Sequence, residues 1–288
     1  MTDIRTDIHT VTVLGTGVLG AQIAYQTAFA GFQVVAWDIT DAAIATAVER
    51  FAGLAATYIA EVPGATAETT AAAIARIRLT TDIADAVADA DLVIEAVPEN
   101  PEIKMSTWAK VGAAAPERTI FTTNTSTLLP STFMHSTGRP DRFLALHYAN
   151  RIWAHNTAEV MGTAKTDPAV FARVVAFATA QGMVPIPLHK EQPGYVLNSL
   201  LVPLLKAGAS LYVHGVADVE AIDATWRIGT GAPLGPFQIY DVVGLTTAYN
   251  ISMMGDETSQ RFAEILRTDY IERGKLGRST GEGFYRYA

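Results

Sequence analysis

LGTGVLGAQIAYQTAFAGFQVVAWD, residues 14–38, contains three glycines in the spacing G-x-G-x-x-G. The apolar, β-branched residues 11–14 that precede the glycines predict a short buried strand. Residues 18–30 predict a helix that ends at Gly31, and the apolar run at 32–37 predicts a second strand. A strand, a glycine-rich turn, a helix and a second strand in this order are the first part of a dinucleotide-binding unit.

Each glycine of this motif has its own physical task in such a unit. Gly15 allows the tight turn, Gly17 lets the backbone approach a pyrophosphate, and Gly20 lets the helix pack closely against the strand. The first helical residues, Val18 and Leu19, offer free backbone N–H groups to phosphate oxygens. We therefore predict that these five residues bind a dinucleotide.

Asp38 follows the second predicted strand, 18 residues after Gly20. A carboxylate about 20 residues beyond the glycines binds the ribose hydroxyls of the adenosine. The same carboxylate repels the 2′-phosphate of NADP, and its neighbours Ile39 and Thr40 carry no positive charge. The predicted cofactor is therefore NAD.

The chain continues with alternating helical and apolar segments. Residues 41–78 predict two helices that break at 62–64, and further buried strands are expected within 90–99, 118–126 and 141–150. This alternation predicts a doubly wound parallel sheet, in which ligands bind beyond the carboxyl ends of the strands. Asp38, Glu99, Ser126 and His147 follow apolar runs, so we expect them to gather at one edge.

Beyond the segment 191–199 the pattern becomes helical and contains no further βαβ unit. We predict an NAD-binding Rossmann-type domain over residues 1–192 and an all-helical domain for substrate binding and dimerisation over residues 193–288. Pro193 and Gly194 form the expected hinge between them.

The composition narrows the classes of partner. Of the 288 residues 49% are hydrophobic and 17% are charged, and the net charge of −8 argues against nucleic acid and acidic membranes as partners. The chain has no cysteine, which excludes disulfides and thiolate metal sites, and we expect no metal. The polar N-terminal segment and the lack of an unbroken apolar run of about 18 residues lead us to expect a cytoplasmic protein outside the membrane.

Several motifs occur in the order and spacing of a known family. They are TNTSTL at 123–128, ALHYAN at 145–150, AEVMGT at 158–163, PGYVLNSLLVPLL at 193–205, GAPLGPFQIYDVVGL at 231–245 and GKLGRSTGEGFYRY at 274–287. Over essentially its whole length the chain resembles the L-3-hydroxyacyl-CoA dehydrogenases, and in particular the bacterial diketoreductases of that family. The resemblance implies an NAD(H)-dependent oxidoreductase that interconverts β-hydroxy and β-keto groups of acyl compounds.

A histidine and a glutamate are the expected acid–base pair. Oxidation of a secondary alcohol needs a base for the hydroxyl proton, and histidine has a pKa near working pH. His147 lies at a predicted strand end, and Glu159 lies 12 residues further on, where a hairpin-like return brings it back beside His147. The resemblance implies that Glu159 orients the imidazole of His147.

The resemblance also implies the remaining site residues. Ser126 is expected to hydrogen-bond the reacting oxygen beside the nicotinamide, and Asn198 is expected to contact the substrate. Family positions near the nicotinamide ribose correspond to Glu99, Lys104 and Asn150.

The sequence departs from the family pattern at two places that concern the substrate. Asn150 is followed by Arg151 where the family often has proline. Relatives that act on coenzyme A thioesters carry lysines after the second strand, whereas residues 41–75 here contain Arg50 as their only cation. A free or esterified β-keto or diketo acid is therefore the expected substrate, and a CoA-specific 3-hydroxyacyl-CoA dehydrogenase is the first alternative.

Two further classes of protein are alternatives. A lysine-dependent β-hydroxyacid dehydrogenase needs a lysine four residues before Asn198, and that residue is Gly194. A non-catalytic NAD-binding structural protein would not need the full set of site residues. Finally, the apolar stretches beyond residue 195 predict a C2 homodimer joined through the helical domain.

Overall fold

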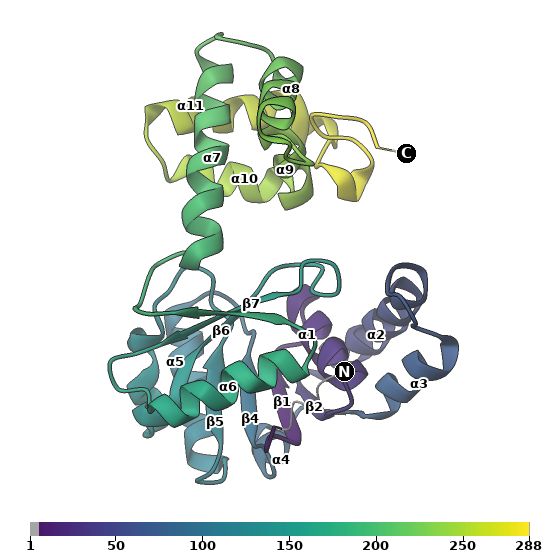
Figure 1. Ribbon diagram of the computed structural model, residues 1–288, viewed down its shortest axis with the longest axis vertical. Helices are drawn as coiled ribbons and strands as arrows, with labels where there is room; N and C mark the ends of the chain where they lie inside the picture. The colour runs from purple at the N-terminus through teal and green to yellow at the C-terminus, as the bar shows by residue number, and fades with distance from the viewer. Residues whose placement is uncertain (1–5, 288) are drawn as a thin grey trace. The chain divides into compact units, whose positions relative to one another are not determined.

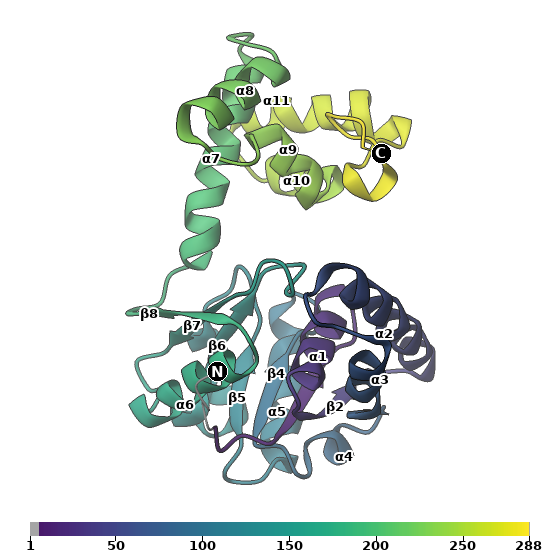
Figure 2. The same cartoon turned by 45° about the vertical axis from the view of Figure 1, so that its right-hand side comes forward.

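The computed structural model describes residues 6–287. Residues 1–5 of the polar N-terminal segment, on which the expected cytoplasmic location partly rests, lie outside the described residues. The chain forms two compact units that divide between Val196 and Leu197. The first unit is a sheet covered by helices and the second is helical (Figure 1, Figure 2). This fold is the doubly wound α/β class with a helical C-terminal domain that the sequence predicts.

The described part of the first unit contains one sheet with the strand order β3-β2-β1-β4-β5-β6-β7-β8. The strands are β1 (Thr10–Leu14), β2 (Gln33–Trp37), β3 (Ile77–Thr80), β4 (Leu92–Glu95), β5 (Ile120–Thr123), β6 (Phe143–Tyr148), β7 (Thr157–Gly162) and β8 (Val184–Leu188). Strands β1 to β6 are mutually parallel, as expected. The ends of β2, β4, β5 and β6 therefore meet at one edge of the sheet.

Three strands were not part of the predicted parallel sheet. Ile77 and Arg78 belong to edge strand β3 although the segment was predicted helical. Strand β7 pairs antiparallel with β6, and β8 continues parallel to β7, so the last two strands run opposite to the others. Strand β8 contains Pro185 and Pro187, which cannot donate ladder hydrogen bonds and are tolerated because β8 is an edge strand.

Helices bury both faces of this sheet. They are α1 (Val18–Phe29), α2 (Asp41–Glu61), α3 (Ala67–Ala75), α4 (Ile83–Val87), α5 (Pro101–Ala114) and α6 (Pro168–Ala180). Along β4, Leu92 and Ile94 join a core with α1 and α6, whereas Val93 joins a core with α4 and α5. This alternation, with both faces apolar, is the property of a strand covered on both sides. Helices α2 and α3 confirm the two helices predicted around a break at 62–64.

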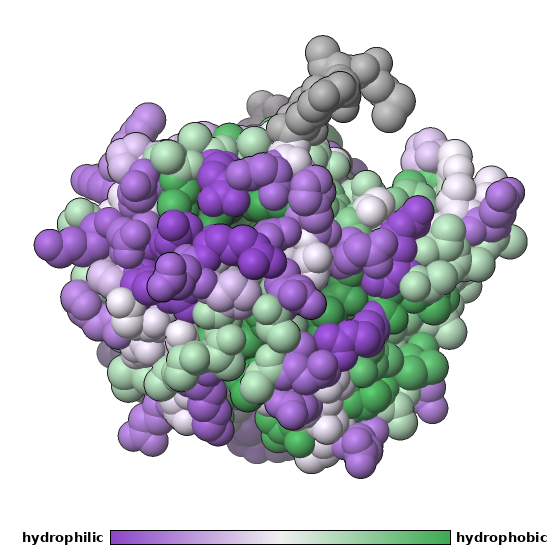
Figure 3. All heavy atoms as spheres, turned by 90° about the horizontal axis from the view of Figure 1, so that it is seen from below, coloured by the Kyte–Doolittle hydropathy of each residue, from purple (hydrophilic) through white to green (hydrophobic). Residues whose placement is uncertain are grey.

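The surface of the first unit away from these cores is mixed. On the face shown in Figure 3, hydrophilic side chains predominate and hydrophobic ones lie between them. Short 3₁₀ turns at Pro130–Thr132, Met134–Thr137 and Pro140–Arg142 connect β5 to β6.

The second unit is a helical bundle with an aromatic core. Its helices are α7 (Tyr195–Val213, which starts in the first unit), α8 (Val219–Thr230), α9 (Pro236–Val243), α10 (Leu245–Met253) and α11 (Glu257–Ile265), followed by a π-helical turn at Leu266–Tyr270 and 3₁₀ turns at Ile271–Arg273 and Arg278–Thr280. Phe237, Tyr240 and Phe262 form the centre of its core. Buried Asp241 accepts hydrogen bonds from the backbone of Phe284 and Tyr285, which attaches the C-terminal segment to this core.

Among the described residues, α7 is the one helix long and apolar enough to cross a membrane by length and composition, with a mean hydropathy of 1.5. It carries Asn198 and Lys206 within its length. Such a helix is weak evidence for a membrane span, because core helices of globular proteins have the same composition.

Candidate active site

The glycine-rich turn between β1 and α1 has no room for side chains at two of its three glycines. Gly15 has a φ of +93°, and a Cβ atom there would lie 2.7 Å from the carbonyl oxygen of Ala96. A Cβ on Gly20 would lie 2.0 Å from the carbonyl oxygen of Gly15. Both positions therefore require glycine, the first for the turn and the second for close packing of α1 against it.

Gly17 is different, because a Cβ atom there would meet nothing within 4 Å. The open side of the turn faces a cavity of about 420 Å³, a size typical of small-molecule sites. The first intrahelical hydrogen bond of α1 runs from Ala21 to Gly17, so the N–H groups of Val18 and Leu19 precede it. The cavity is lined by Gly15, Gly17, Trp37, Asp38, Ile39, Ala96, Val97, Pro98, Ile103 and Thr107. An open backbone turn at a helix N-terminus fits the pyrophosphate of a dinucleotide.

Asp38 is fixed at the end of β2 by the same turn. Its Oδ2 accepts the backbone N–H of Thr16 at 2.8 Å and the hydroxyl of Thr16 at 2.6 Å. Arg50 of α2 donates from Nη1 to the carbonyl oxygen of Thr16 at 3.0 Å. A cation therefore lies beside the turn, although the sequence neighbours of Asp38 carry none.

His147 lies between two polar partners near the end of β6. Its Nδ1 is 2.9 Å from Oε2 of Glu159, and its Nε2 is 3.1 Å from Oγ of Ser126. His147 and Glu159 are 4% and 3% exposed, so the pair is shielded from water. Glu159 is the direct cross-strand partner of His147 in the antiparallel β6–β7 ladder. The expected hairpin-like return is this ladder.

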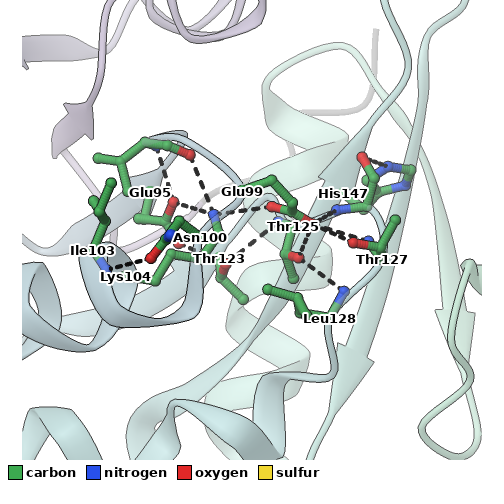
Figure 4. Close-up of polar contacts among 12 residues, drawn as sticks. Glu95, Glu99, Asn100, Ile103, Lys104, Thr123, Thr125, Thr127, Leu128 and His147 are labelled. Atoms are coloured by element: carbon green, nitrogen blue, oxygen red, sulfur yellow. Dashed lines mark hydrogen bonds and ion pairs between the residues drawn. The ribbon is translucent and has the colours of Figure 1, made fainter. Parts of the chain in front are cut away.

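Glu99 shapes the loop that carries Ser126 (Figure 4). Its Oε1 accepts the hydroxyls of Thr125 and Thr127, at 2.5 and 2.8 Å, and the backbone N–H groups of Ser126 and Thr127, each at 3.1 Å. Burial raises the pKa of Glu99, but the hydrogen bond from Thr125 and the charge of Lys104 outweigh it, and the pKa lies below its usual value. Glu99 is therefore a carboxylate that orders residues 125–127.

Lys104 is 1% exposed and its Nζ lies 2.6 Å from Oε1 of Glu95 and 3.2 Å from Oε2 of Glu99. Glu95 also accepts the hydroxyl of Thr123 at 2.7 Å and the N–H of Val97 at 2.9 Å. A buried charge is stable only when it is paired and hydrogen-bonded, and this cluster meets that condition. Lys104 thus contacts Oε2 of Glu99, whereas Oε1 of Glu99 accepts the hydroxyls of Thr125 and Thr127 (Figure 4).

The structure does not bring every predicted residue into this arrangement. Asn150 is exposed in the turn after β6. The next residue, Arg151, has a φ of +59° and pairs with Glu61 at the end of α2, 2.7 Å away. Asn198 belongs to the second unit, so its contact with substrate stays a prediction.

Sequence reasoning missed two residues, Tyr195 beside His147 and Glu95 beside Lys104. The ring of Tyr195 stacks on the imidazole of His147, with centroids 4.3 Å apart and planes at 14°. Glu95 holds Lys104, and the signal for it was a carboxylate ending an otherwise apolar strand. Tyr195 had a weaker signal, because an aromatic residue after Pro193-Gly194 is equally typical of a core position.

Comparisons with known proteins show the family of this chain. The family model for the NAD-binding domain of 3-hydroxyacyl-CoA dehydrogenases matches residues 10–192, and the model for their C-terminal domain matches residues 194–287. The human mitochondrial hydroxyacyl-coenzyme A dehydrogenase is 35% identical over 285 residues, which cover 96% of this chain and 90% of that protein.

Two solved structures extend the likeness. A diketoreductase, described as a catalyst of dicarbonyl compounds, is 61% identical with a TM-score of 0.96 over 98% of this chain and 100% of that one. The (S)-3-hydroxybutyryl-CoA dehydrogenase of Ralstonia eutropha is 31% identical with a TM-score of 0.83 over 98% of this chain and 100% of that one.

A dinucleotide turn and a histidine–glutamate pair at the same sheet edge define an NAD-dependent oxidoreductase that acts on CH–OH groups. The chain belongs to the 3-hydroxyacyl-CoA dehydrogenase family. It interconverts β-hydroxy and β-keto groups, with NAD as cofactor.

Proposed function

We propose that His147 is the general acid and base of this reaction, that Glu159 orients it, and that Ser126 binds the reacting oxygen. The observation that carries the proposal is the continuous contact from Glu159 through His147 to Ser126. Glu159 holds Nδ1, so Nε2 is left to exchange a proton with an oxygen placed beside Ser126. Hydride exchange is the chemistry that NAD supplies when it is bound.

Different residues at the glycine-rich turn bind different parts of the cofactor. Gly15, Gly17 and Gly20 with the first N–H groups of α1, at Val18 and Leu19, hold the pyrophosphate, and Asp38 holds the adenosine ribose. Glu99, whose Oε1 accepts hydrogen bonds from the loop of Ser126, lies with Lys104 and Asn150 near the nicotinamide ribose. Asn198 contributes an amide to the substrate from the helical domain. The cavity lining and the hydrogen bonds from Thr16 support the roles of Gly15, Gly17 and Asp38, whereas the roles of Glu99, Lys104, Asn150 and Asn198 rest on the resemblance to the family.

For the substrate, we propose a β-keto or β,δ-diketo ester or acid that is not linked to coenzyme A. Residues 41–75 bring Arg50 as their one cation, and it is directed to the carbonyl oxygen of Thr16. Arg151 lies beside the end of α2, but its charge is paired with Glu61 at 2.7 Å. The phosphates of coenzyme A would therefore find few charge-assisted hydrogen bonds here. The likeness to a diketoreductase supports the same substrate class.

The test is NADH consumption in parallel with acetoacetyl-CoA and with free and esterified β-keto and diketo acids. We expect kcat/KM for the preferred ester or acid to equal or exceed that for acetoacetyl-CoA. A low-micromolar KM for acetoacetyl-CoA without turnover of any unthioesterified compound would identify a CoA-specific dehydrogenase. NADH binding without turnover of any substrate would identify a non-catalytic NAD-binding protein.

We also propose a cytoplasmic homodimer in which residues 1–192 bind NAD and residues 193–288 serve substrate binding and dimerisation. The helical unit exposes large apolar side chains, including Leu200, Val216, Ile228 and Met254. Large apolar side chains exposed in this way are typical of surfaces that subunits cover. Light scattering at micromolar concentration should give twice the mass of the chain, and a stable monomer would contradict the proposal.

A further inference from the structure

Tyr195 contacts the imidazole of His147 on its face, a side that neither Glu159 nor Ser126 occupies. The two rings stack with centroids 4.3 Å apart and planes at 14°, and Tyr195 is completely buried. A ring packed flat on an imidazole blocks rotation of that imidazole out of its plane. The orientation of His147 is thus restricted by packing as well as by its two hydrogen bonds.

The hydroxyl of Tyr195 contacts the other half of the site. It donates to the carbonyl oxygen of Thr125 at 2.7 Å, and Thr125 directly precedes Ser126. Burial, followed by the carboxylates of Glu99 and Glu159, raises the pKa of Tyr195, so the hydroxyl keeps its proton and remains a donor. One side chain therefore contacts both the imidazole and the loop that carries the serine.

The backbone at this point reinforces these contacts. Tyr195 has a φ of +56°, a left-handed conformation that is unfavourable for a bulky residue. The next residue, Val196, donates its N–H to Oε1 of Glu159 at 2.8 Å. A strained backbone persists only where the surrounding contacts compensate for it, and the contacts with His147 and Glu159 are among those that do so here.

We propose that Tyr195 is a positioning residue for the proton transfer, which holds the imidazole of His147 and the hydroxyl of Ser126 in mutual register. This inference rests on the proposed roles of His147 and Ser126. The ring of Tyr195 fixes the plane of the imidazole, and its hydroxyl fixes the loop at residues 125–127. Together they maintain the 3.1 Å separation between Nε2 of His147 and Oγ of Ser126.

Two variants separate the two contacts. Tyr195→Phe keeps the ring and removes the hydrogen bond to Thr125, and Tyr195→Leu removes both. Because a misplacement of about 1 Å costs up to about a hundredfold in rate, we expect kcat to fall about tenfold in Tyr195→Phe and about a hundredfold in Tyr195→Leu. The dissociation constant of NADH, measured by fluorescence, should stay unchanged. The primary isotope effect on kcat, measured with NADH deuterated at the transferred position, should rise because the chemical step becomes slower.

Tyr148→Phe is the matched control. Tyr148 is next to His147, is 1% exposed, and donates its hydroxyl to Oε1 of Gln181 at 2.7 Å on the opposite, apolar side of β6. Removal of the Tyr148 hydroxyl deletes a buried tyrosine hydrogen bond, as Tyr195→Phe does. We expect a loss of unfolding free energy comparable to that of Tyr195→Phe, with an unchanged isotope effect.

The outcome depends on comparison with His147→Ala. If His147→Ala is inactive and both Tyr195 variants retain the kcat and isotope effect of the parent, the inference is overturned. It is also overturned if Tyr148→Phe changes the isotope effect as much as Tyr195→Phe does, since the effect would then follow from lost stability. An active His147→Ala would instead overturn the proposed acid–base role on which the inference rests.

Discussion

Glu159 lies directly opposite His147 in the antiparallel ladder of β6 and β7, and its Oε2 is 2.9 Å from Nδ1 of the imidazole. Directly opposed residues project from the same face of a sheet, with Cβ atoms about 4.5–5.5 Å apart. The pair is therefore positioned by the backbone of two paired strands. Its burial also keeps water from competing for the imidazole.

Replacement of His147 or Glu159 should lower kcat and leave the affinity for NADH unchanged. His147→Ala should lower kcat by about 10²–10⁴-fold, because the proton acceptor is lost. Glu159→Gln should lower it less, since the imidazole remains but is poorly oriented. Stopped-flow and steady-state assays measure both effects, and NADH fluorescence should show unchanged affinity. An active His147→Ala enzyme would show that another group transfers the proton.

The proposed role of Asp38 in the choice between NADH and NADPH can be tested with one substitution. Asp38→Asn removes the charge but keeps an oxygen for both hydrogen bonds from Thr16. The parent should prefer NADH strongly, and Asp38→Asn should improve kcat/KM for NADPH by about tenfold, because a like-charge repulsion disappears.

Arg50 provides the control for this change. Its guanidinium lies at the same turn, bonded to Thr16, and can meet a 2′-phosphate once the carboxylate is gone. The double variant Asp38→Asn, Arg50→Gln should therefore gain less with NADPH than Asp38→Asn alone. Equal rates with NADH and NADPH in the unmodified protein would contradict the assignment of Asp38.

The stability that Glu99 gives to the loop at residues 125–127 should depend on pH. The pKa of Glu99 in the folded protein is below its usual value of 4.5, because the hydrogen bond from Thr125 and the charge of Lys104 outweigh burial. A carboxyl whose pKa is lowered by folding stabilises the folded protein at pH values above its usual pKa. This stabilisation is lost as the pH falls through the lowered pKa.

The difference in unfolding free energy between the parent and Glu99→Gln should therefore be constant between about pH 6 and 8 and should shrink below about pH 4.5. Urea unfolding at several pH values measures it. A difference that grew as the pH fell would mean that Glu99 is not held as a carboxylate.

The surface of α2 offers a test of the coenzyme A hypothesis. The helical pattern of the sequence alone suggests positions 55 and 59 for added lysines. In the structure, Ala55 packs against the core, whereas Ala56 and Ile59 are exposed. Ala56→Lys with Ile59→Lys should raise kcat/KM for acetoacetyl-CoA by about tenfold or more, since each phosphate contact is worth about 1.5–3 kcal/mol.

The gain should fade at high salt and should not extend to an unthioesterified substrate. Ala56→Gln with Ile59→Gln adds similar length without charge and should give no gain. If the glutamine pair performs as well as the lysine pair, the phosphates are not bound at α2.

The cofactor half of the protein could be predicted because its determinants are local. Gly15, Gly17, Gly20 and Asp38 act through backbone freedom and through their position at the end of a strand, and both follow from spacing along the chain. The apolar runs of β1, β2, β4, β5 and β6 are likewise visible in the sequence, because both faces of these strands are buried. Edge strands β3 and β8 lack that signal and were missed.

The sequence by itself thus determined the α/β class, the dinucleotide turn and the residue types needed to reduce a β-keto group. Only the tertiary structure decided how those residues are held: the register that sets Glu159 against His147, the carboxylate of Glu99 that orders the loop of Ser126, and the ring of Tyr195 on the imidazole. These contacts join residues that are 12, 27 and 48 positions apart. Their formation depends on strand register and close packing, which arise only when distant segments are buried against one another.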